Sequence, residues 1–251
     1  MKNTLLLLVY IFLLFHETVL SQSTGKFEVN IDYGVINYYV PEDYNSANKY
    51  PLIVAMPLAG KSGFDFRERI IRQAQELNAI LICPDGDQWT SSLLQSSIDH
   101  TKSNYTIDDN LLVLTGHSYG GGVVFKYGIE NYLSIAGIIG IAPSLFDVSF
   151  PANIVPFIPM GLISGSDDVF KMYSDQISDL YEQENGKCKY IIKDAVQHDG
   201  PYFESLEFKD DWIECYNFIL MNSANDVKDE KNNVFFISSS HSKLYFITVY
   251  S

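Results

Sequence analysis

The sequence predicts an α/β fold built on a largely parallel central sheet. Short, almost continuous apolar runs bounded by glycine or proline recur along the chain, and longer segments separate most of them. Strands that are apolar throughout need a cover on both faces, as the strands of parallel sheets have. Strands that alternate with helical segments predict right-handed βαβ crossovers, with helices on both faces of the sheet.

The first predicted elements form an antiparallel hairpin. Residues 26–32 and 35–40 are two β-rich runs, separated by Tyr33-Gly34 and closed by Pro41. This pattern is typical of a hairpin. Further apolar runs predict the remaining strands, at residues 52–56, 79–83, 111–115, 135–142, 157–164 and 190–193.

Helical spacing is clearest between the first two of those later strands. Over residues 64–77, four apolar side chains recur at the spacing of one helix face, namely Phe66, Ile70, Ala74 and Leu77. A last helix is expected over residues 210–220, after the final strand. Only residues 143–156 follow the 135–142 strand, with three prolines and no helical spacing, so we expect no cap domain over the sheet.

The N-terminal residues have the layout of a secretory leader. Lys2 precedes an apolar run at residues 5–14, and Val19-Leu20-Ser21 stands at the usual cleavage spacing. The apolar run is about ten residues long, whereas a helix needs ~20 to span a bilayer. We therefore expect a signal peptide over residues 1–21, export to the extracellular space or the periplasm, and no stable membrane insertion.

Residues 22–220 are then expected to form one α/β domain, followed by a C-terminal tail over residues 221–251 whose role the sequence does not indicate. The tail begins with a polar, charged stretch and ends β-rich. The formal net charge of -14 repels polyanions, so no nucleic-acid partner is expected. Oligomeric state has no signature in the sequence.

Three cysteines allow at most one intramolecular disulfide in an oxidising compartment. Cys83 ends an apolar strand-like run and is expected to be buried. A bridge between Cys188 and Cys215 is left open, because spacing alone does not decide the geometry.

The strongest chemical signal is the pentapeptide Gly116-His117-Ser118-Tyr119-Gly120, which directly follows an apolar strand and precedes a helical segment. This is G-x-S-x-G in the strand–turn–helix setting of a nucleophile elbow. The glycines are needed because the sharp reversal leaves no room for a Cβ beside a strained serine. Ser118 is therefore the expected nucleophile.

In proteins with this elbow the acid and then the base follow the serine along the chain. Two histidines follow Ser118, and His241 lies in the tail. His198 stands in a loop after the strand at residues 190–193, where a base can reach back over the sheet. We expect His198 to be the base.

The acid should also lie just beyond the carboxyl end of a strand. Asp168 and Asp167 directly follow the strand at residues 157–164, and Asp147 is a third candidate. A carboxylate there would hold the imidazole of the base in the correct tautomer. Asp168 is the preferred acid and Asp167 the alternative.

With these residues in place, the chain resembles the lidless secreted esterases of the α/β-hydrolase superfamily, especially polyhydroxybutyrate depolymerases and feruloyl esterases. Residues 51–56, 82–86 and 107–110 carry this resemblance together with the elbow. It implies an α/β-hydrolase fold, with Ser118 as nucleophile, Asp168 as acid and His198 as base.

One departure from the family concerns the oxyanion hole. The family carries His-Gly at the end of the strand before the oxyanion loop, whereas this chain has Pro57-Leu58-Ala59-Gly60. Proline has no N–H to donate. The expected donors are the backbone amide of Tyr119 and that of Ala59 or Leu58.

The expected function is hydrolysis of a small-molecule or polymer-attached carboxylic ester through an acyl-enzyme, with no cofactor and no metal. Five histidines without paired ligand spacing give no metal motif. The alternatives are a serine peptidase or a lipase on the same fold, and a catalytically weak ligand-binding pseudoenzyme.

Overall fold

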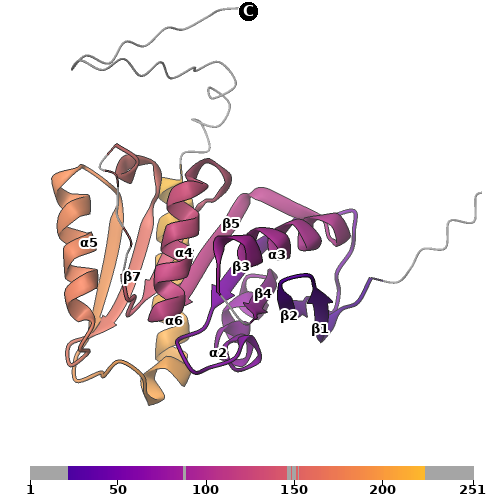
Figure 1. Ribbon diagram of the computed structural model, residues 1–251, viewed down its shortest axis with the longest axis horizontal. Helices are drawn as coiled ribbons and strands as arrows, with labels where there is room; N and C mark the ends of the chain where they lie inside the picture. Colours follow the sequence, from indigo (N-terminus) through magenta and orange to yellow (C-terminus); the bar gives the residue numbers. More distant parts are fainter. Residues whose placement is uncertain (1–21, 87–88, 146–147, 149–150, 152, 224–251) are drawn as a thin grey trace, which may run out of the picture.

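A computed structural model describes residues 22–86, 89–145, 148, 151 and 153–223 of the chain, which fold around one eight-stranded sheet (Figure 1). The order of the strands is β1-β2-β4-β3-β5-β6-β7-β8. The strands are β1 (Gly25–Ile31), β2 (Gly34–Val40), β3 (Tyr50–Met56), β4 (Ile80–Asp85), β5 (Ile107–His117), β6 (Gly137–Ile141), β7 (Met160–Gly165) and β8 (Cys188–Lys193).

Strand β2 pairs antiparallel with both β1 and β4, and every other neighbouring pair is parallel. The predicted hairpin and the largely parallel sheet are both confirmed. Because β3, β5, β7 and β8 run in the same direction, the loops that follow them meet at one edge of the sheet.

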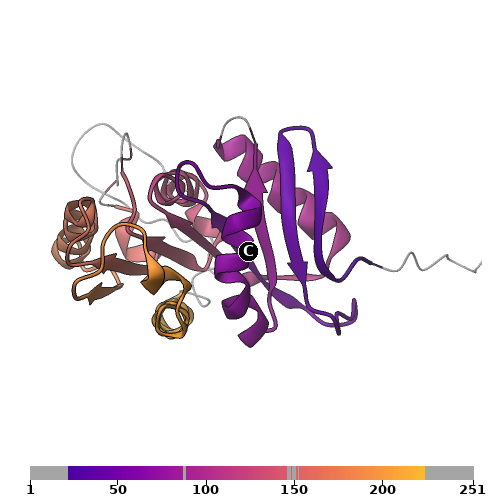
Figure 2. The same ribbon diagram turned by 90° about the horizontal axis from the view of Figure 1, so that it is seen from below.

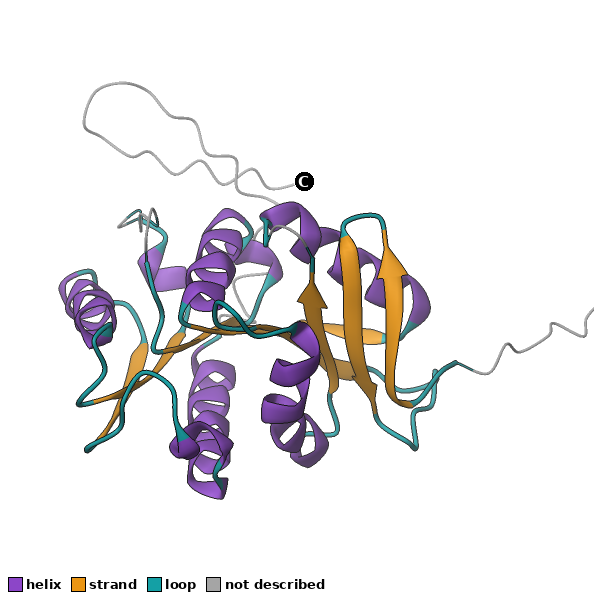
Figure 3. Cartoon of the chain, turned by 60° about the horizontal axis from the view of Figure 1, so that its bottom comes forward, coloured by secondary structure: helices purple, strands orange, loops and turns teal. Residues whose placement is uncertain are grey.

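Helices cover both faces of the sheet, as predicted (Figures 2 and 3). The helices are α2 (Gly63–Glu76), α3 (Ser91–Asn104), α4 (Tyr119–Glu130), α5 (Lys171–Gln183) and α6 (Leu206–Asn222). Side chains of α3, α4 and α5 share one apolar core with the sheet, and those of α2 and α6 share the other. Short 3-10 turns lie at η1 (Tyr132–Ser134), η2 (Val155–Phe157) and η3 (Pro201–Glu204).

The start of α2 is fixed by its own cap and by the end of β4. Ser62 and Asp65 form a capping box, in which each side chain accepts a hydrogen bond from the other residue's backbone N–H. The carboxylate of Asp85 accepts from the backbone N–H of Gly63 at 2.9 Å. These contacts fix where α2 begins and hold its first turn beside the end of β4.

Helix α6 is anchored to the strand that leads to Ser118. The fully buried indole of Trp212 donates to Thr115 Oγ1 at 3.1 Å, and Thr115 Oγ1 donates to the carbonyl of Ile139 at 3.0 Å. Gly161 of β7 has no side chain where Cys215 of α6 packs, since a Cβ there would lie 2.6 Å from the Cβ of Cys215. A buried hydrogen bond and a close approach therefore hold α6 against the sheet.

The cysteine pairing that spacing left open does not form. Cys83, Cys188 and Cys215 are all free thiols. Cys188 packs against the apolar core beneath α3, α4 and α5, whereas Cys215 belongs to the core beneath α2 and α6. The sheet separates the two side chains. Burial raises the pKa of both thiols, that of Cys188 to about 12, so neither is a ready nucleophile.

The connection from β6 to β7, residues 142–159, carries one regular element among its described residues, the turn η2. The described fold therefore has no cap domain over the sheet, as predicted. The predicted signal peptide, residues 1–21, lies outside the described residues, as does the predicted tail from residue 224 onward. Helix α6 continues to Asn222, slightly beyond the predicted boundary at 220. None of the described helices combines the length and apolar character needed to cross a bilayer.

Candidate active site

The chain reverses sharply from β5 into α4 at Ser118, which adopts φ 53° and ψ -120°. This is a strained conformation for a residue with a Cβ. A Cβ on Gly116 would lie 2.3 Å from the carbonyl oxygen of Gly120, and one on Gly120 would lie 2.2 Å from that of Pro57. The predicted requirement for glycine at both positions is confirmed.

Two backbone hydrogen bonds hold the reversed chain in place. The N–H of Ser118 donates to the carbonyl of Ile141 at 3.0 Å, and the carbonyl of Ser118 accepts from the N–H of Ser144 at 2.9 Å. Both partners lie at or just after the end of β6. The neighbouring strand thus fixes the backbone that presents the serine.

His198 lies between Ser118 and Asp168, in the loop after β8. Its Nε2 is 2.7 Å from Ser118 Oγ, and its Nδ1 is 3.0 Å from Asp168 Oδ1 and 3.1 Å from Asp168 Oδ2. An ionised carboxylate only accepts, so Nδ1 carries the proton and Nε2 accepts from the serine hydroxyl. The structure brings together three residues that the sequence singled out.

The two adjacent aspartates differ completely in their surroundings. The side chain of Asp168 is fully buried, and its Oδ1 also accepts from the backbone N–H of Phe170 at 2.7 Å. Asp167 is exposed, and its carboxylate accepts from Ser166 Oγ at 3.2 Å. Asp147, the third candidate, lies outside the described residues. Of the described candidates, Asp168 is the one in contact with the imidazole.

The expected oxyanion donors flank the same serine. Tyr119 is the first residue of α4, and Leu58 and Ala59 lie in the loop after β3, beyond Pro57. Within the described residues, no backbone carbonyl accepts from the N–H of any of these three. The N–H groups of the first helical turn also favour negative charge at this end of α4.

The structure also places three residues at the site that the sequence did not single out, His117, Arg69 and Asp199. His117 is fully buried. Its Nε2 lies 2.8 Å from the backbone oxygen of His198, and its Nδ1 lies 3.0 Å from Nη1 of Arg69 on α2. The Nη2 of Arg69 reaches Asp199 Oδ1 at 3.0 Å. In the sequence, His117 is only the variable residue before Ser118 in the G-x-S-x-G motif, and no local pattern marks Arg69.

The direction of these hydrogen bonds follows from the guanidinium, which can only donate. Nδ1 of His117 therefore accepts from Arg69, and Nε2–H donates to the carbonyl of His198. Burial, followed by the positive charge of Arg69, lowers the pKa of His117 to about 3. The ring is neutral at physiological pH.

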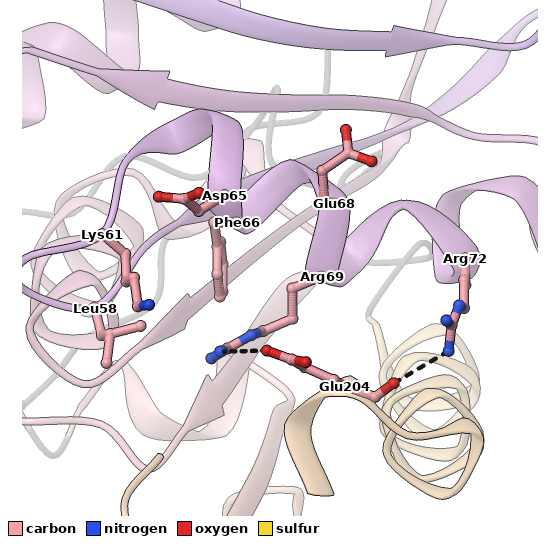
Figure 4. A pocket seen from close by; sticks show the side chains of 8 residues that line it. All are labelled: Leu58, Lys61, Asp65, Phe66, Glu68, Arg69, Arg72 and Glu204. Atoms are coloured by element: carbon pink, nitrogen blue, oxygen red, sulfur yellow. Dashed lines mark hydrogen bonds and ion pairs between the residues drawn. The ribbon is translucent and has the colours of Figure 1, made fainter. Parts of the chain in front are cut away.

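A cavity of about 310 Å³ lies beside the site, between the loop after β3, helix α2 and η3 (Figure 4). Arg69 and Arg72 point into it and both contact Glu204, Arg69 through the carboxylate at 3.7 Å and Arg72 through the backbone oxygen at 3.1 Å. No group of three or more His, Cys, Asp or Glu residues that would suit a metal ion is found in the described part of the chain.

No protein-family model and no curated protein matches this chain. Among solved structures it resembles a ferulic acid esterase from Anaeromyces mucronatus, with a TM-score of 0.61 at 14% identity over 83% of this chain and 93% of that one. It also resembles S-formylglutathione hydrolase from Staphylococcus aureus, with a TM-score of 0.63 at 13% identity over 79% and 97% of the two chains.

A fluorophosphonate-binding serine hydrolase of Staphylococcus aureus is similar too, with a TM-score of 0.64 at 12% identity over 79% of this chain and 99% of that one. Likenesses at this level of identity show the fold. The chain has the α/β-hydrolase fold, as the sequence predicted.

The shifted pKa of His117 predicts a pH dependence of stability. Between pH 6.5 and about 3, this histidine binds a proton in the unfolded chain and not in the folded one. Its contribution therefore lowers the free energy of unfolding as pH falls through this window, by up to ~1.4 kcal/mol per pH unit. His117→Gln cannot titrate, so its stability should fall less steeply with acid. Urea unfolding of both proteins at pH 7.0, 5.5 and 4.5 measures the difference. If the free energy of unfolding falls equally with pH in both proteins, His117 is not a neutral buried group.

Proposed function

We propose that the protein is an exported serine esterase that hydrolyses carboxylic esters, with Ser118 as nucleophile, His198 as base and Asp168 as orienting acid. The observation that carries the proposal is the continuous hydrogen-bonded series from Ser118 Oγ through His198 to the buried Asp168, with distances of 2.7 and 3.0 Å. It begins at a serine in strained backbone geometry, at the carboxyl edge of a parallel sheet. Chance packing does not explain strain, contact and burial together.

In the acylation step, Ser118 Oγ attacks the ester carbonyl carbon while its proton passes to Nε2 of His198. The imidazolium that forms is stabilised by Asp168, whose carboxylate accepts from Nδ1–H. When the tetrahedral intermediate collapses, the C–O bond to the alcohol breaks and Nε2 returns the proton to the leaving oxygen. The acyl group stays on Ser118 as an ester.

In the deacylation step, His198 takes a proton from water, which attacks the acyl carbon. The bond between that carbon and Ser118 Oγ then breaks, Nε2 of His198 returns the proton to Ser118 Oγ, and the carboxylic acid leaves. In both steps negative charge develops on the former carbonyl oxygen. The N–H of Tyr119 and that of Leu58 or Ala59 are the donors proposed for it. Preorganised donors of this kind are worth ~10²–10³ in rate each.

The proposed substrate is a small-molecule or polymer-attached ester with a short acyl part. Among its described residues, the β6–β7 connection holds a single 3-10 turn, so no described helix covers Ser118 from that side. The ring of Tyr119 is half-exposed beside the nucleophile, with its centroid 5.7 Å from that of Trp89. The solved structures that this chain resembles include one in complex with ferulic acid, which supports an ester substrate.

The first test removes the nucleophile. A fluorophosphonate probe should label the wild-type protein once, on Ser118, because only an activated serine reacts readily. Ser118→Ala should abolish labelling and lower kcat by roughly six orders of magnitude. Mass spectrometry of the labelled peptide and turnover of a panel of acyl esters measure both effects. Hydrolysis that persists in Ser118→Ala would rule out the assignment, and a folded wild-type protein that neither labels nor turns over would favour a ligand-binding pseudoenzyme.

The second test compares the two adjacent aspartates. Asp168→Asn should lower kcat by ~10³–10⁴-fold, because the amide no longer holds the imidazole in the required tautomer. Asp167→Asn is the matched control and should retain near-normal turnover, since that carboxylate is exposed and contacts Ser166. Steady-state kinetics of both variants on the same ester measure this difference in kcat. A large loss of kcat in Asp167→Asn, together with near-normal kcat in Asp168→Asn, would overturn the choice of acid.

The third test concerns the acyl chain. A site without a cap leaves the far end of a long chain in water, and each such methylene forfeits ~0.8 kcal/mol of binding. We expect kcat/KM to be highest for short acyl chains, to fall as the chain lengthens, and to show no jump at a lipid interface. Kinetics on dissolved and emulsified esters of increasing length, run in parallel, measure this. A marked preference for emulsified long-chain triglycerides would favour a lipase.

A further inference from the structure

We infer that His117 is a positioning residue, which together with Arg69 holds the backbone of the His198 loop at the distance from Ser118 that proton transfer requires. The inference rests on the proposed function, because it assigns His198 the role of base. His117 immediately precedes Ser118 and hydrogen-bonds the carbonyl of His198 at 2.8 Å. One residue thus links the nucleophile's backbone to the base's backbone.

The loop that carries His198 is held at two ends. Its first half is tied to the acid loop, where the N–H of Asp167 donates to the carbonyl of Val196 at 3.1 Å and the N–H of Ala195 donates to Ser166 Oγ at 2.9 Å. Its second half is tied through His117 to the elbow and through Asp199 to Arg69. The imidazole of His198 lies between these two anchors.

Arg69 serves both contacts of the second anchor with one planar group. Its Nη1 donates to Nδ1 of His117 at 3.0 Å, and its Nη2 donates to the carboxylate of Asp199 at 3.0 Å. The side chain is 8% exposed, so this fork is shielded from competing water. Lysine has a point charge in place of a fork and cannot make both contacts in the same geometry.

The ring of His117 is also fixed sideways by packing. Its centroid lies 4.8 Å from that of Phe203 and 5.3 Å from that of His198. The Nε2–H donor therefore has one orientation, aimed at the carbonyl of His198. A base displaced by as little as 1 Å can cost ~10²-fold in rate, so this contact is expected to act on turnover.

The test uses two replacements of His117. His117→Phe keeps a planar ring and removes the donor, whereas His117→Gln supplies an amide N–H for His198 and an amide oxygen for Arg69. We expect kcat to fall about 10- to 100-fold in His117→Phe with KM unchanged, because the base serves both acylation and deacylation. His117→Gln should recover kcat to within several-fold of wild type. Equal kcat in His117→Phe and wild type overturns the inference, and so does an equal loss in both variants.

A matched pair on α2 covers the case in which His117→Phe fails to fold. Arg69→Lys and Arg72→Lys keep the charge and remove the guanidinium on the same helix, and Arg72 contacts Glu204 but not the elbow or the His198 loop. We expect kcat to fall ~10-fold or more in Arg69→Lys and to stay at the wild-type value in Arg72→Lys. The same kcat in both variants contradicts the inference.

A spectroscopic readout separates this inference from the proposed function. The proton on Nδ1 of His198, bonded to the buried Asp168, should give a resolved downfield ¹H resonance in wild type and Arg72→Lys. It should weaken or shift in Arg69→Lys and His117→Phe. If Ser118→Ala and wild type are equally inactive, the proposed function fails, and the resonance alone then tests whether His117 and Arg69 position His198. A resonance unchanged in both Arg69→Lys and His117→Phe overturns the positioning role.

Discussion

At Ser118 the chain turns from a strand into a helix within one residue, and the rest of the site is built around that turn. The conformation costs about 1–3 kcal/mol by itself and persists because its surroundings over-determine it. Gly116 and Gly120 let the backbone close to distances that no Cβ allows, and the end of β6 hydrogen-bonds the serine on both sides. Below the sheet, Trp212 fixes the strand that feeds the turn. Loss of any of these supports would let the serine relax away from the base.

Once the turn is fixed, the parallel sheet determines where its partners stand. Asp168 follows β7 and His198 follows β8, on the same side of β5 and at the same edge. Asp168 is two strands away from Ser118 and His198 is three, so the imidazole of His198 reaches Ser118 on a loop that runs back across the edge. A loop of this kind is the least rigid part of such a site, which is why its anchors to the acid loop, to His117 and to Arg69 matter.

That Ser118, Asp168 and His198 lie together could be predicted, because each follows an apolar strand and chain order then restricts the choice. The antiparallel hairpin and the helix carrying Arg69 were likewise visible in local patterns. The roles of His117 and Arg69 were not, since they depend on α2 and β5 meeting in space. Whether Cys188 and Cys215 pair could not be predicted either, because linear spacing does not say on which face of the sheet a residue lies. The structure places the two side chains on opposite faces.

The neutrality of His117 suits the proposed mechanism. In that mechanism His198 becomes an imidazolium in each step, and a positive charge on the adjacent ring, 5.3 Å away by centroids, would oppose that. Burial keeps His117 uncharged, so it donates to the base's backbone without repelling the base's charge. The guanidinium of Arg69, which orients His117, lies at Nδ1 of that ring, whereas the carbonyl of His198 lies at Nε2. The positive charge of Arg69 is balanced there by the carboxylates of Asp199 and Glu204. His117 and Arg69 thus set the direction of hydrogen bonding near Ser118, and in the proposed mechanism Asp168 is the group that stabilises the positive charge on His198.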